Sequence, residues 1–339
     1  GKGATSGVLI KNAEALEGLE KITTLIVDKT GTLTMGKPIL SKVFTVASFS
    51  GDELIKLAAS LETASEHPLA EAIVRGAKDR GITIPKVDKF ETFSGMGVRG
   101  KVGNQEILLG NKKLLSTNGI DPAELVAMAS ELQAEGAGVM LMAVDGKPAG
   151  ILAVEDPIKE SSKEAIEYFH RQGIKVVMVT GDNKLTAQAV AKKLNIDAVE
   201  AEILPAEKNR IVKKFQAEGA SVAMAGDGIN DAPGLAQAEV GIAMGTGTDI
   251  AIESASVTLV KGDLMGIVRA HHLSKATMRS IRQNLFFAFI YNVLGVPVAA
   301  GILYPYFGIL LSPMLASLAM SLSSVSVILN SLRLSRVKI

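Results

Sequence analysis

The chain has 339 residues, of which 47% are hydrophobic, 21% charged and only 4% aromatic, so it is long enough for about two domains with cores of their own. Its 36 Lys and Arg residues balance 35 Asp and Glu residues, which argues against a nucleic-acid-binding protein, because such proteins carry a basic excess. The absence of cysteine excludes disulfides, thiol nucleophiles and cysteine-ligated zinc or iron–sulfur sites within this chain.

The first element that bears on function is a predicted buried strand at residues 24–27, which runs into the turn DKTGT at residues 28–32. A carboxylate at the end of such a strand can attack a phosphoryl group and form an aspartyl phosphate. Thr30 cannot act as an acid or base for rapid hydrolysis, as a second carboxylate at that position could. We therefore expect a phosphoenzyme at Asp28 that persists long enough to drive another process.

The next stretch, residues 41–153, differs from the rest of the chain in its pattern of apolar and polar residues. Two helical segments are followed by short alternating runs, with hairpin signals such as Gly103-Asn104 and Asp145-Gly146 between them. We expect an antiparallel α+β domain that is inserted into the first domain, with the chain leaving near Pro38 and returning near Asp156.

Two further buried strands are predicted at residues 175–179 and 221–225, and each runs into a turn rich in Gly and Asp. Strands alternating with helices are typical of a doubly wound α/β sheet, in which ligands bind at the carboxyl ends of the strands. Four aspartates should therefore meet in one crevice: Asp28, Asp182, Asp227 and Asp231. Carboxylates so close together repel each other, and a hard cation such as Mg²⁺ that bridges them to a phosphate relieves the repulsion. Taken singly, each turn is equally compatible with ordinary helix capping.

No Asp, Glu, Lys, Arg or His occurs between Asn284 and Leu332, and an aromatic turn at residues 304–308 divides this run into two. Residues 284–304 would span about 31 Å as a helix, close to the ~30 Å of a bilayer core, and residues 309–331 are similarly long. Basic residues flank the pair on both sides, so we expect a transmembrane hairpin with both ends in the cytoplasm. The alternative is a buried helical hairpin in a soluble core.

The beginning of the chain indicates that more protein precedes it. The first residue is Gly rather than Met, and no apolar region of a signal peptide follows. Two transmembrane helices alone would also make a poor transport path. We therefore expect this sequence to be a piece of a longer protein.

Three motifs, DKTGT at residues 28–32, TGD at 180–182 and GDGIND at 226–231, resemble in order and spacing the signature set of the P-type ATPases. The resemblance covers essentially the whole chain. It implies a haloacid dehalogenase-like (HAD-like), doubly wound parallel sheet as the phosphorylation domain, an inserted antiparallel α+β nucleotide-binding domain and a two-helix transmembrane hairpin. The boundaries that we assign are 1–22 for a linker from a preceding membrane helix, 23–40 and 154–275 for the phosphorylation domain, 41–153 for the nucleotide-binding domain, 284–304 and 309–331 for the membrane helices, and 332–339 for a cytoplasmic tail.

The resemblance also implies roles at the phosphorylation site. ATP would phosphorylate Asp28, and Thr30 would contact the phosphoryl group and help to position Mg²⁺. The other residues that match the catalytic set of the family are Lys29, Thr180, Gly181, Asp182 and Lys208, of which Thr180, Gly181 and Lys208 would hold phosphate oxygens. The implied ligands of Mg²⁺ are Asp28, Thr30 and Asp227, with Asp231 a weaker one, and Asn230 and Asp231 would complete the pocket.

The inserted domain narrows the resemblance to the heavy-metal P-type pumps. The run Ser65-Glu66-His67-Pro68 is similar to the His-Pro motif of that branch. The residues that fall at its other ATP contacts, besides His67, are Glu62, Gly95, Gly97, Gly110 and Asn111. Glycines let the backbone approach a flat adenine, and an imidazole or a carboxylate can bond to its edge. Without the resemblance, a His before a Pro indicates the start of a surface helix, and Gly-Met-Gly indicates a turn.

Polar and sulfur-containing side chains in the two apolar segments bear on the transported metal. Tyr291-Asn292 lies in the first segment, and Met320 and Ser324, four residues apart, share one face of the second. A thioether is a soft ligand that favours Cu(I) over Zn²⁺. The arrangement resembles the Tyr-Asn and Met-x-x-Ser-Ser signatures of Cu(I)-exporting pumps, with Met314 as an accessory ligand on the exit side. The alternative is helix packing, with Met filling space and Ser and Asn bonding between helices.

The parts of such a pump that this chain lacks are the Cys-Pro-Cys helix, the actuator domain and the N-terminal metal-binding domains. The resemblance implies that its partners are ATP, the copper ion, membrane lipid, a copper chaperone and the missing N-terminal part of the same polypeptide, with no nucleic acid. It places the protein in the plasma membrane of a bacterium, with the phosphorylation and nucleotide-binding domains in the cytoplasm.

The leading hypothesis is therefore an ATP-driven exporter of Cu(I). An exporter of Zn²⁺ or another divalent metal is the alternative within the same class. A membrane-tethered phosphatase would use the same aspartyl chemistry, although Thr30 and the inserted domain argue against it. A nucleotide-binding regulatory membrane protein without chemistry is the last alternative.

Overall fold

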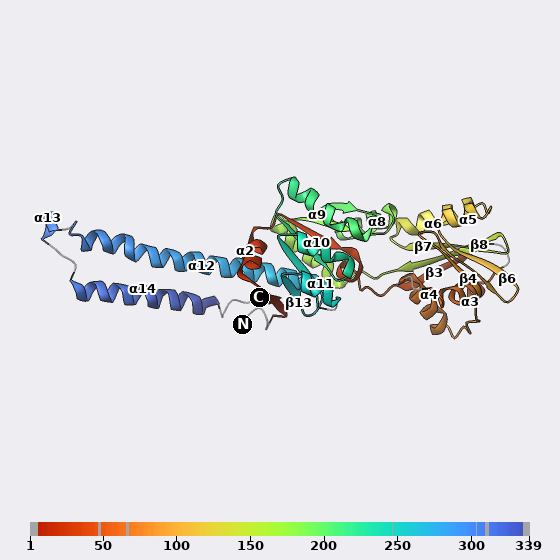
Figure 1. Ribbon diagram of the computed structural model, residues 1–339, viewed down its shortest axis with the longest axis horizontal. Coiled ribbons are helices and arrows are strands. Elements are labelled where there is room, and N and C mark those ends of the chain that lie inside the picture. The colour runs from red at the N-terminus through yellow and green to blue at the C-terminus, as the bar shows by residue number, and fades with distance from the viewer. Residues whose placement is uncertain are drawn as a thin grey trace.

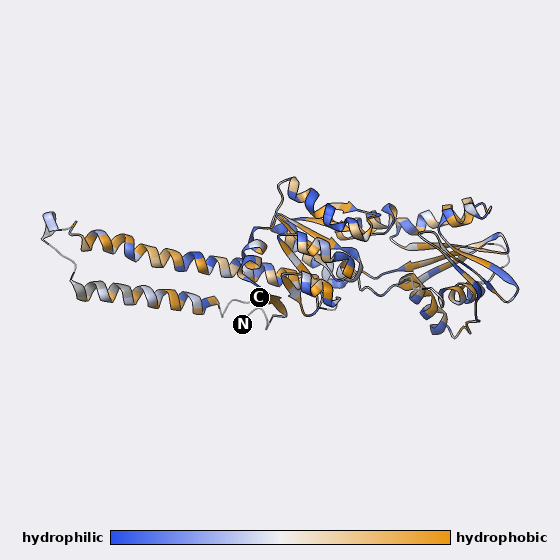
Figure 2. Ribbon diagram, in the orientation of Figure 1, coloured by the Kyte–Doolittle hydropathy of each residue, from blue (hydrophilic) through white to orange (hydrophobic). Residues whose placement is uncertain are grey.

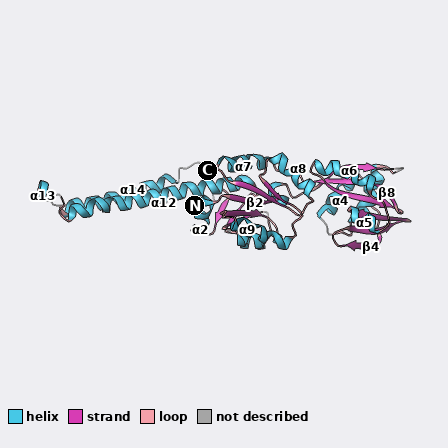
Figure 3. Cartoon of the chain, turned by 90° about the horizontal axis from the view of Figure 1, so that it is seen from above, coloured by secondary structure: helices cyan, strands magenta, loops and turns pink. Residues whose placement is uncertain are grey.

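The structure is a computed structural model that describes residues 6–46, 49–65, 68–245, 247–302, 304–308 and 312–334. Figure 1 shows three parts in a row: a domain with an antiparallel sheet, a domain with a parallel sheet, and a pair of long helices. The view from above in Figure 3 shows the same order, with the helix pair projecting from the parallel-sheet domain on the side away from the antiparallel one.

Within the described residues, the parallel-sheet domain is built on seven strands in the order β1-β13-β12-β11-β2-β9-β10, and only β1 and β13 pair in antiparallel fashion. The strands are β1 (Val8–Ile10), β2 (Thr24–Asp28), β9 (Lys175–Val179), β10 (Ala198–Glu200), β11 (Val222–Gly226), β12 (Val240–Met244) and β13 (Val257–Leu259). The strands predicted at residues 24–27, 175–179 and 221–225 are confirmed to within one residue as β2, β9 and β11. The strand order places β2 between the other two, so their carboxyl ends lie side by side.

Helices cover both faces of this sheet, which explains why its strands are continuously apolar. Along β2, Leu25 and Val27 pack into the core on one face and Ile26 into the core on the other, because side chains alternate along a strand. The first core is closed by α2 (Ala13–Lys21), α7 (Glu160–Arg171), α8 (Lys184–Leu194) and the start of α12. The second is closed by α9 (Lys208–Ala217), α10 (Ala232–Gln237) and α11 (Asp249–Ser254).

The inserted domain contains a six-stranded antiparallel sheet in the order β3-β8-β7-β6-β5-β4. The strands are β3 (Ile39–Thr45), β4 (Asp88–Phe93), β5 (Gly97–Val102), β6 (Gln105–Gly110), β7 (Gly138–Val144) and β8 (Lys147–Glu155). One face is covered by α3 (Gly51–Glu62) and α4 (Pro68–Asp79), the other by α5 (Lys112–Thr117) and α6 (Ala123–Ala134). The expected antiparallel α+β insertion into a doubly wound parallel sheet is therefore confirmed.

The helix pair consists of α12 (Leu264–Ala299) and α14 (Pro313–Leu334), with the short helix α13 (Tyr304–Phe307) between them. We expected helices at residues 284–304 and 309–331, and the first of these differs at both ends. It starts earlier because residues 264–282 belong to the same helix and pack on α2 and α7, with Asp263 Oδ1 accepting from the Gly266 N–H at 2.8 Å. It ends earlier because the chain turns at Gly301, whose φ of +88° favours glycine.

Apolar residues are frequent along the part of both helices that lies beyond the parallel-sheet domain (Figure 2). Large apolar side chains there are exposed, among them Phe289 at 64% and Leu294 at 63%. Within the described residues, no helix has both the length and the apolar content that crossing a bilayer requires. The two helices are joined by amides near the domain: Asn330 Nδ2 donates to Asn284 Oδ1 at 2.9 Å, and Asn284 Nδ2 donates to Ser331 Oγ at 2.9 Å. The transmembrane hairpin stays a prediction.

Candidate active site

One edge of the parallel sheet holds a lysine between two buried aspartates. β2 ends at Asp28 and the turn after the adjacent β11 carries Asp231, so the strand order brings both carboxylates to the same edge. Lys208, the first residue of α9, donates from Nζ to Asp28 Oδ1 at 2.7 Å and to Asp231 Oδ1 at 2.5 Å. All three residues are at most 8% exposed. We call this group the aspartate–lysine cluster.

The aspartate–lysine cluster contains two carboxylates and one ammonium group. Burial raises the pKa of Asp28 to about 7 against the opposing charge of Lys208, and the carboxylate of Asp231 adds to the rise. Burial lowers the pKa of Lys208, but the two carboxylates outweigh it and raise that pKa above its ordinary value. Lys208 is therefore charged, and a further cation is needed before both carboxylates are stable in their ionised forms.

Asp227 faces this cluster from the turn after β11. Burial raises its pKa, and the nearby carboxylate of Asp231 raises it further. Gly31 approaches so closely, with a φ of +72°, that a Cβ on it would lie 1.7 Å from Asp227 Oδ2. One carboxylate oxygen each from Asp28, Asp227 and Asp231 lies within 4.8 Å of the other two. Three carboxylates at this spacing fit Mg²⁺, a hard cation that prefers oxygen ligands.

Asp231 is held in place by the backbone of its own turn. Its Oδ2 accepts hydrogen bonds from the N–H groups of Gly228 at 2.9 Å and Asp227 at 3.2 Å, while its Oδ1 binds Lys208. Both oxygens of this carboxylate therefore have protein partners. Because these contacts fix its position, Asp231 can organise the site around Asp28 and Asp227.

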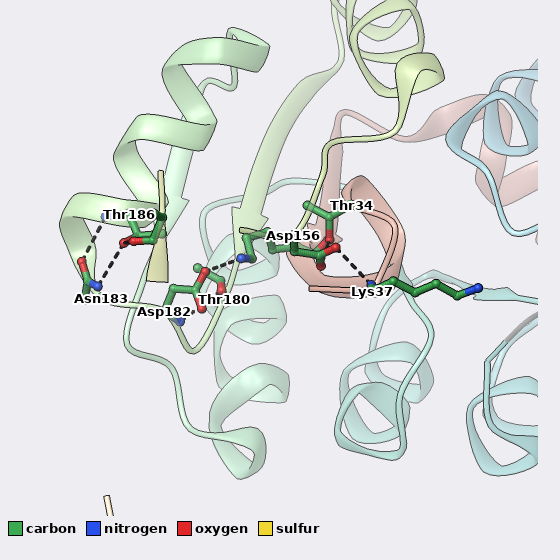
Figure 4. A network of polar contacts seen from close by, with 9 residues as sticks. Thr34, Lys37, Asp156, Thr180, Asp182, Asn183 and Thr186 are labelled. Atoms are coloured by element: carbon green, nitrogen blue, oxygen red, sulfur yellow. Dashed lines mark hydrogen bonds and ion pairs between the residues drawn. The ribbon is translucent and has the colours of Figure 1, made fainter. Parts of the chain in front are cut away.

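The turn after β9 lies on the other side of β2 and carries Thr180, Gly181 and Asp182. Thr180 is buried, and its Oγ1 accepts a hydrogen bond from the Asp182 N–H at 3.1 Å (Figure 4). The Asp182 carboxylate forms an ion pair with Lys29, the residue that follows Asp28. Lys29 therefore links the turn after β2 to the turn after β9.

Three residues that position the turn after β2 were not predicted from the sequence: Thr34, Asp156 and Lys159. Asp156 Oδ2 accepts a hydrogen bond from Thr34 Oγ1 at 2.5 Å, and Asp156 Oδ1 accepts one from the Lys37 N–H at 3.2 Å (Figure 4). Lys159 Nζ donates to the carbonyl oxygen of Gly31. The signal that could have indicated them is the charged pair Asp156 and Lys159, three residues apart where the chain re-enters the domain.

The remaining predicted residues of this site are exposed in the same turns: Thr30, Gly181 and Asn230. Each is adjacent in the chain to a buried residue of the site. In addition, the buried Thr32 Oγ1 has no hydrogen-bond partner among the described residues. A buried polar atom of this kind indicates a group that a ligand can satisfy.

The glycines predicted to contact ATP lie in the inserted domain rather than at the aspartate–lysine cluster. Gly97 of β5 pairs with Gly110 of β6, and a Cβ on Gly110 would lie 2.2 Å from Met96 O. Asn111 Nδ2 donates to Gly95 O at 2.9 Å, while its Oδ1 caps α5. The structure thus brings these four residues together, and the backbone contact alone already requires glycine at position 110.

Glu62 ends α3, the helix that packs on β5 and β6, and is only 3% exposed. Burial raises the pKa of its carboxyl group, and its Oε2 has no hydrogen-bond partner among the described residues. This is the environment in which a polar ligand could bond to a carboxyl group. His67, the remaining predicted contact, lies outside the described residues, as does Glu66.

The predicted metal ligands in the helix pair are less completely described. Tyr291 and Asn292 lie on α12, and Asn292 Nδ2 donates to Ala288 O of its own helix at 3.0 Å. Met314, on α14, is 84% exposed. Ser324 also lies on α14 and is exposed, whereas the side chain of Met320 lies outside the described residues. The described contacts do not join these residues into one site.

Comparison with curated proteins gives matches over nearly the whole chain. A copper-exporting P-type ATPase of Legionella pneumophila is 59% identical over 99% of this chain and 46% of its own length. A silver exporting P-type ATPase of Salmonella typhimurium is 55% identical over 100% of this chain and 41% of its own length. The chain thus spans less than half the length of these relatives.

Solved structures and a family model match the same regions. A zinc-transporting PIB-type ATPase in its E2.Pi state superposes with a TM-score of 0.78 at 35% identity, over 98% of this chain and 53% of the other. The catalytic domain of a CPx-ATPase superposes with a TM-score of 0.64 at 31% identity, over 80% of this chain and 97% of that domain. The model of the haloacid dehalogenase-like hydrolases matches residues 22–239. The chain therefore belongs to the haloacid dehalogenase-like hydrolase family, and its relatives within that family are heavy-metal P-type ATPases.

Proposed function

We propose that this chain is the C-terminal part of a P-type ATPase that exports Cu(I), and that ATP phosphorylates it on Asp28. The observation that carries the proposal is the aspartate–lysine cluster at the carboxyl edge of the parallel sheet. Phosphoryl transfer depends mainly on positioning and on charge stabilisation. The cluster supplies both, because a buried carboxylate and an ammonium group lie 2.7 Å apart next to two further aspartates.

Asp28 acts as the nucleophile. Lys208 binds its Oδ1, so Oδ2 is the oxygen that forms a bond to the γ-phosphorus of ATP while the bond to the departing ADP oxygen breaks. The carboxylate must be ionised to attack, and positive charge near it lowers its pKa from the raised value of about 7. Lys208 then balances the negative charge that develops on the phosphoryl oxygens, together with Thr180 and Gly181.

Asp28 and Asp227 would hold the Mg²⁺ ion, with Asp231 as a weaker ligand and Thr30 contributing beside Asp28. An ion bound there would supply positive charge against the phosphoryl oxygens. The chain itself fixes the spacing of these carboxylates. Gly31 allows the turn after β2 to approach Asp227, and Lys159 holds the carbonyl group of Gly31.

The phosphoenzyme should be long-lived in this chain. Thr30 offers a hydroxyl group where a carboxylate could activate water, so the residues of this site do not supply a base at that position. Stored energy can then drive a change elsewhere in the protein. This property distinguishes a pump from a membrane-tethered phosphatase, which needs fast hydrolysis.

ATP would bind in the inserted domain, at the residues predicted for it: Glu62, His67, Gly95, Gly97, Gly110 and Asn111. The buried carboxyl group of Glu62 and the close pair of strands at Gly97 and Gly110 support this placement. Two connections, into β3 and out of β8, join the inserted domain to the parallel-sheet domain. Movement about them would carry the γ-phosphate to Asp28.

The helix pair would lie in a bacterial plasma membrane, with the two domains in the cytoplasm. The run without Asp, Glu, Lys, Arg or His from Asn284 to Leu332 and the exposed apolar side chains on α12 and α14 support this. The Cu(I) pathway would include Tyr291, Asn292, Met320 and Ser324, with Met314 at the exit. The thioether of Met320 suits Cu(I), and the relatives named above export copper or silver. The missing N-terminal part and a copper chaperone would complete the system.

The identity of the transported metal can be tested by incubating the full-length pump with radiolabelled ATP and Mg²⁺ and adding either Cu(I) or Zn²⁺. We expect Cu(I) to raise the acid-stable, hydroxylamine-labile label severalfold and Zn²⁺ to leave it unchanged. Met320→Leu keeps the volume but removes the sulfur, so it should abolish the Cu(I) effect, whereas Met128→Leu in the inserted domain should not.

The second candidate is a zinc exporter, which the likeness to a zinc-transporting PIB-type ATPase favours. It predicts that Zn²⁺ raises the label and Cu(I) does not. The same experiment decides between the two, because both metals are compared on one preparation. A response to Zn²⁺ alone would end the copper proposal.

A further inference from the structure

A groove of about 1250 Å³ lies where the helix pair meets the parallel-sheet domain, away from the candidate active site. Four structural elements contribute to its lining: α2 through Glu20, α7 through Tyr168, the middle of α12, and the end of α14. The lining includes four Lys and Arg residues, Lys275, Arg279, Arg282 and Arg333, and a single carboxylate, that of Glu20. We call it the basic groove.

The positive charge of the basic groove is mostly not neutralised by the protein. Glu20 forms an ion pair with Arg282: the two terminal nitrogens of Arg282 donate to the two carboxylate oxygens of Glu20 at 2.8 and 2.6 Å. Lys275 donates to the neutral Gln172 Oε1 at 2.7 Å. Arg279 and Arg333 form no ion pair with a described residue. Two guanidinium groups on different helices thus face a groove with no second carboxylate among its described lining residues, which favours an anionic ligand with several acceptor oxygens.

The other end of the basic groove is apolar. Phe286 and Phe287 of α12 and Leu334 of α14 line it, and Phe286 is 60% exposed. From Asn284 onward α12 carries no Asp, Glu, Lys, Arg or His, so polarity changes along the helix within about one turn of Arg282. A ligand that satisfies the whole groove must have an anionic head and a hydrocarbon part. Inorganic phosphate would bond to the arginines but leave the phenylalanine side chains in water.

We propose that the basic groove binds an anionic phospholipid, with its phosphate between Arg279 and Arg333 and an acyl chain along Phe286. This rests on the proposed function only in placing α12 and α14 in a membrane. Basic pockets between helices at the cytoplasmic surface are the recognised chemistry for lipid headgroups. Arg279 and Arg333 lie close to the two ends of the apolar run, Asn284 and Leu332. With that run in the bilayer core, both arginines would lie at the depth of the lipid phosphate groups.

The position of the basic groove gives the lipid a way to influence phosphorylation. Tyr168 on α7 lines the groove and its hydroxyl group lies 2.9 Å from Nδ1 of His271 on α12. Helix α7 begins directly after Lys159, and the Lys159 side chain donates to Gly31 O in the turn that follows Asp28. A lipid in the groove therefore touches the helix pair and the helix that leads to the active site. We expect it to hold the two in one relative position and so to raise metal-dependent turnover.

The test uses the full-length pump in nanodiscs of phosphatidylcholine, with or without phosphatidylglycerol. Native mass spectrometry should show phosphatidylglycerol retained by the wild-type pump, and retention should fall several-fold in the double variant Arg279→Gln/Arg333→Gln. The matched control Arg80→Gln/Lys86→Gln removes two exposed charges from the inserted domain and should retain the lipid. Phosphatidylglycerol should also raise the metal-dependent ATPase rate of the wild type and the control, but not of the groove variant.

Three results would overturn the lipid proposal: no retention by the wild-type pump, equal retention by the groove variant, or displacement of the lipid by millimolar inorganic phosphate. The last would show that the groove is a site for free phosphate. Phosphoenzyme formation in phosphatidylcholine alone is measured in parallel and should be equal in all variants. If it is absent in the wild type, the proposed function fails while the retention experiment still decides the lipid site.

Discussion

The two sheets of this molecule place their candidate functional residues in opposite ways. The parallel sheet collects charged side chains from separate turns at one edge, where Asp28, Asp231 and Lys208 are buried together. The antiparallel sheet brings Gly97 and Gly110 face to face, where any side chain would collide with the backbone. Buried opposite charges are costly and call for a chemical explanation, whereas close-packed glycines are explained by packing alone.

Because of this difference, the two candidate sites are supported by different kinds of observation. The proposed phosphorylation site is supported by its own electrostatics, because nothing in the packing of the parallel sheet requires two buried aspartates. The nucleotide site depends on resemblance and on one buried carboxyl group, that of Glu62. Mutations at the first sheet should therefore change phosphorylation as well as stability, whereas Gly110→Ala in the second sheet should act through stability.

The largest effect is expected from Lys208→Met. It leaves two buried carboxylates without their cation, so phosphoenzyme formation should fall by roughly 10²–10³ and the free energy of unfolding by about 3 kcal/mol. Radiolabelled ATP and urea unfolding measure the two quantities. Lys213→Met, on the exposed side of the same helix, should change neither. A normal label in the Lys208 variant would remove the electrostatic basis of the site.

A smaller effect is expected from Gly31→Ala, because the new methyl group would meet Asp227 Oδ2. Displacing this carboxylate should raise the Mg²⁺ concentration needed for half-maximal phosphorylation by about tenfold. Gly173→Ala is the matched control, since Gly173 has nearly the same φ, +73°, but open space around its Cβ position. If both variants need the same Mg²⁺ concentration, backbone strain rather than Asp227 explains the result.

In the antiparallel sheet, Gly110→Ala should lower the free energy of unfolding of the inserted domain by about 1–3 kcal/mol. The added methyl group would press on Met96 O, and the φ of Gly110 is not positive, so the effect is one of space. Gly51→Ala, which has nothing within 4 Å of its Cβ position, serves as the control. Thermal unfolding with and without ATP separates the two roles. Unchanged stability with weakened ATP binding would contradict the packing explanation.

The smallest effect concerns pH. Because burial raises the pKa of Asp28 to about 7 in the folded state, the folded protein holds a proton that the unfolded chain has lost. This contribution to stability is present at low pH and is lost as the pH rises toward neutrality. Asp28→Asn should therefore raise the melting temperature by a few degrees at pH 8 and leave it unchanged near pH 4. Asp79→Asn, at an exposed aspartate, should shift the melting temperature at neither pH. A difference in melting temperature between Asp28→Asn and the wild type that grows toward low pH would contradict a raised pKa of Asp28.

Much of the parallel sheet and its site could be predicted because the signals are local. Apolar runs followed by Gly/Asp turns indicate strand ends, and the doubly wound topology then brings those ends together. This is why four aspartates, Asp28, Asp182, Asp227 and Asp231, were predicted to meet. Three of them do, whereas Asp182 pairs with Lys29 instead of joining their group. The ion pair between Lys29 and Asp182 could not be predicted, because it depends on the separation of two turns that only the folded sheet sets.

Other features depend on contacts that sequence pattern does not encode. Asp156 and Lys159 act on the turn after β2 across more than a hundred residues of inserted chain. The start of α12 at Leu264 was not predicted, because residues 264–282 carry basic side chains and pack on α2 and α7, while the run without charged residues begins only at Asn284. Local periodicity gives the type of element, but tertiary contacts set its ends.

The most direct test is to locate the phosphate on the chain. The full-length pump is incubated with ATP, Mg²⁺ and Cu(I), the acyl phosphate is trapped by borohydride reduction, and the modified peptide is sequenced by mass spectrometry. We predict a single reduced residue, Asp28, and none in the Asp28→Asn variant. Modification of another carboxylate, or turnover of ATP by a pump that carries no modified residue, would contradict the account.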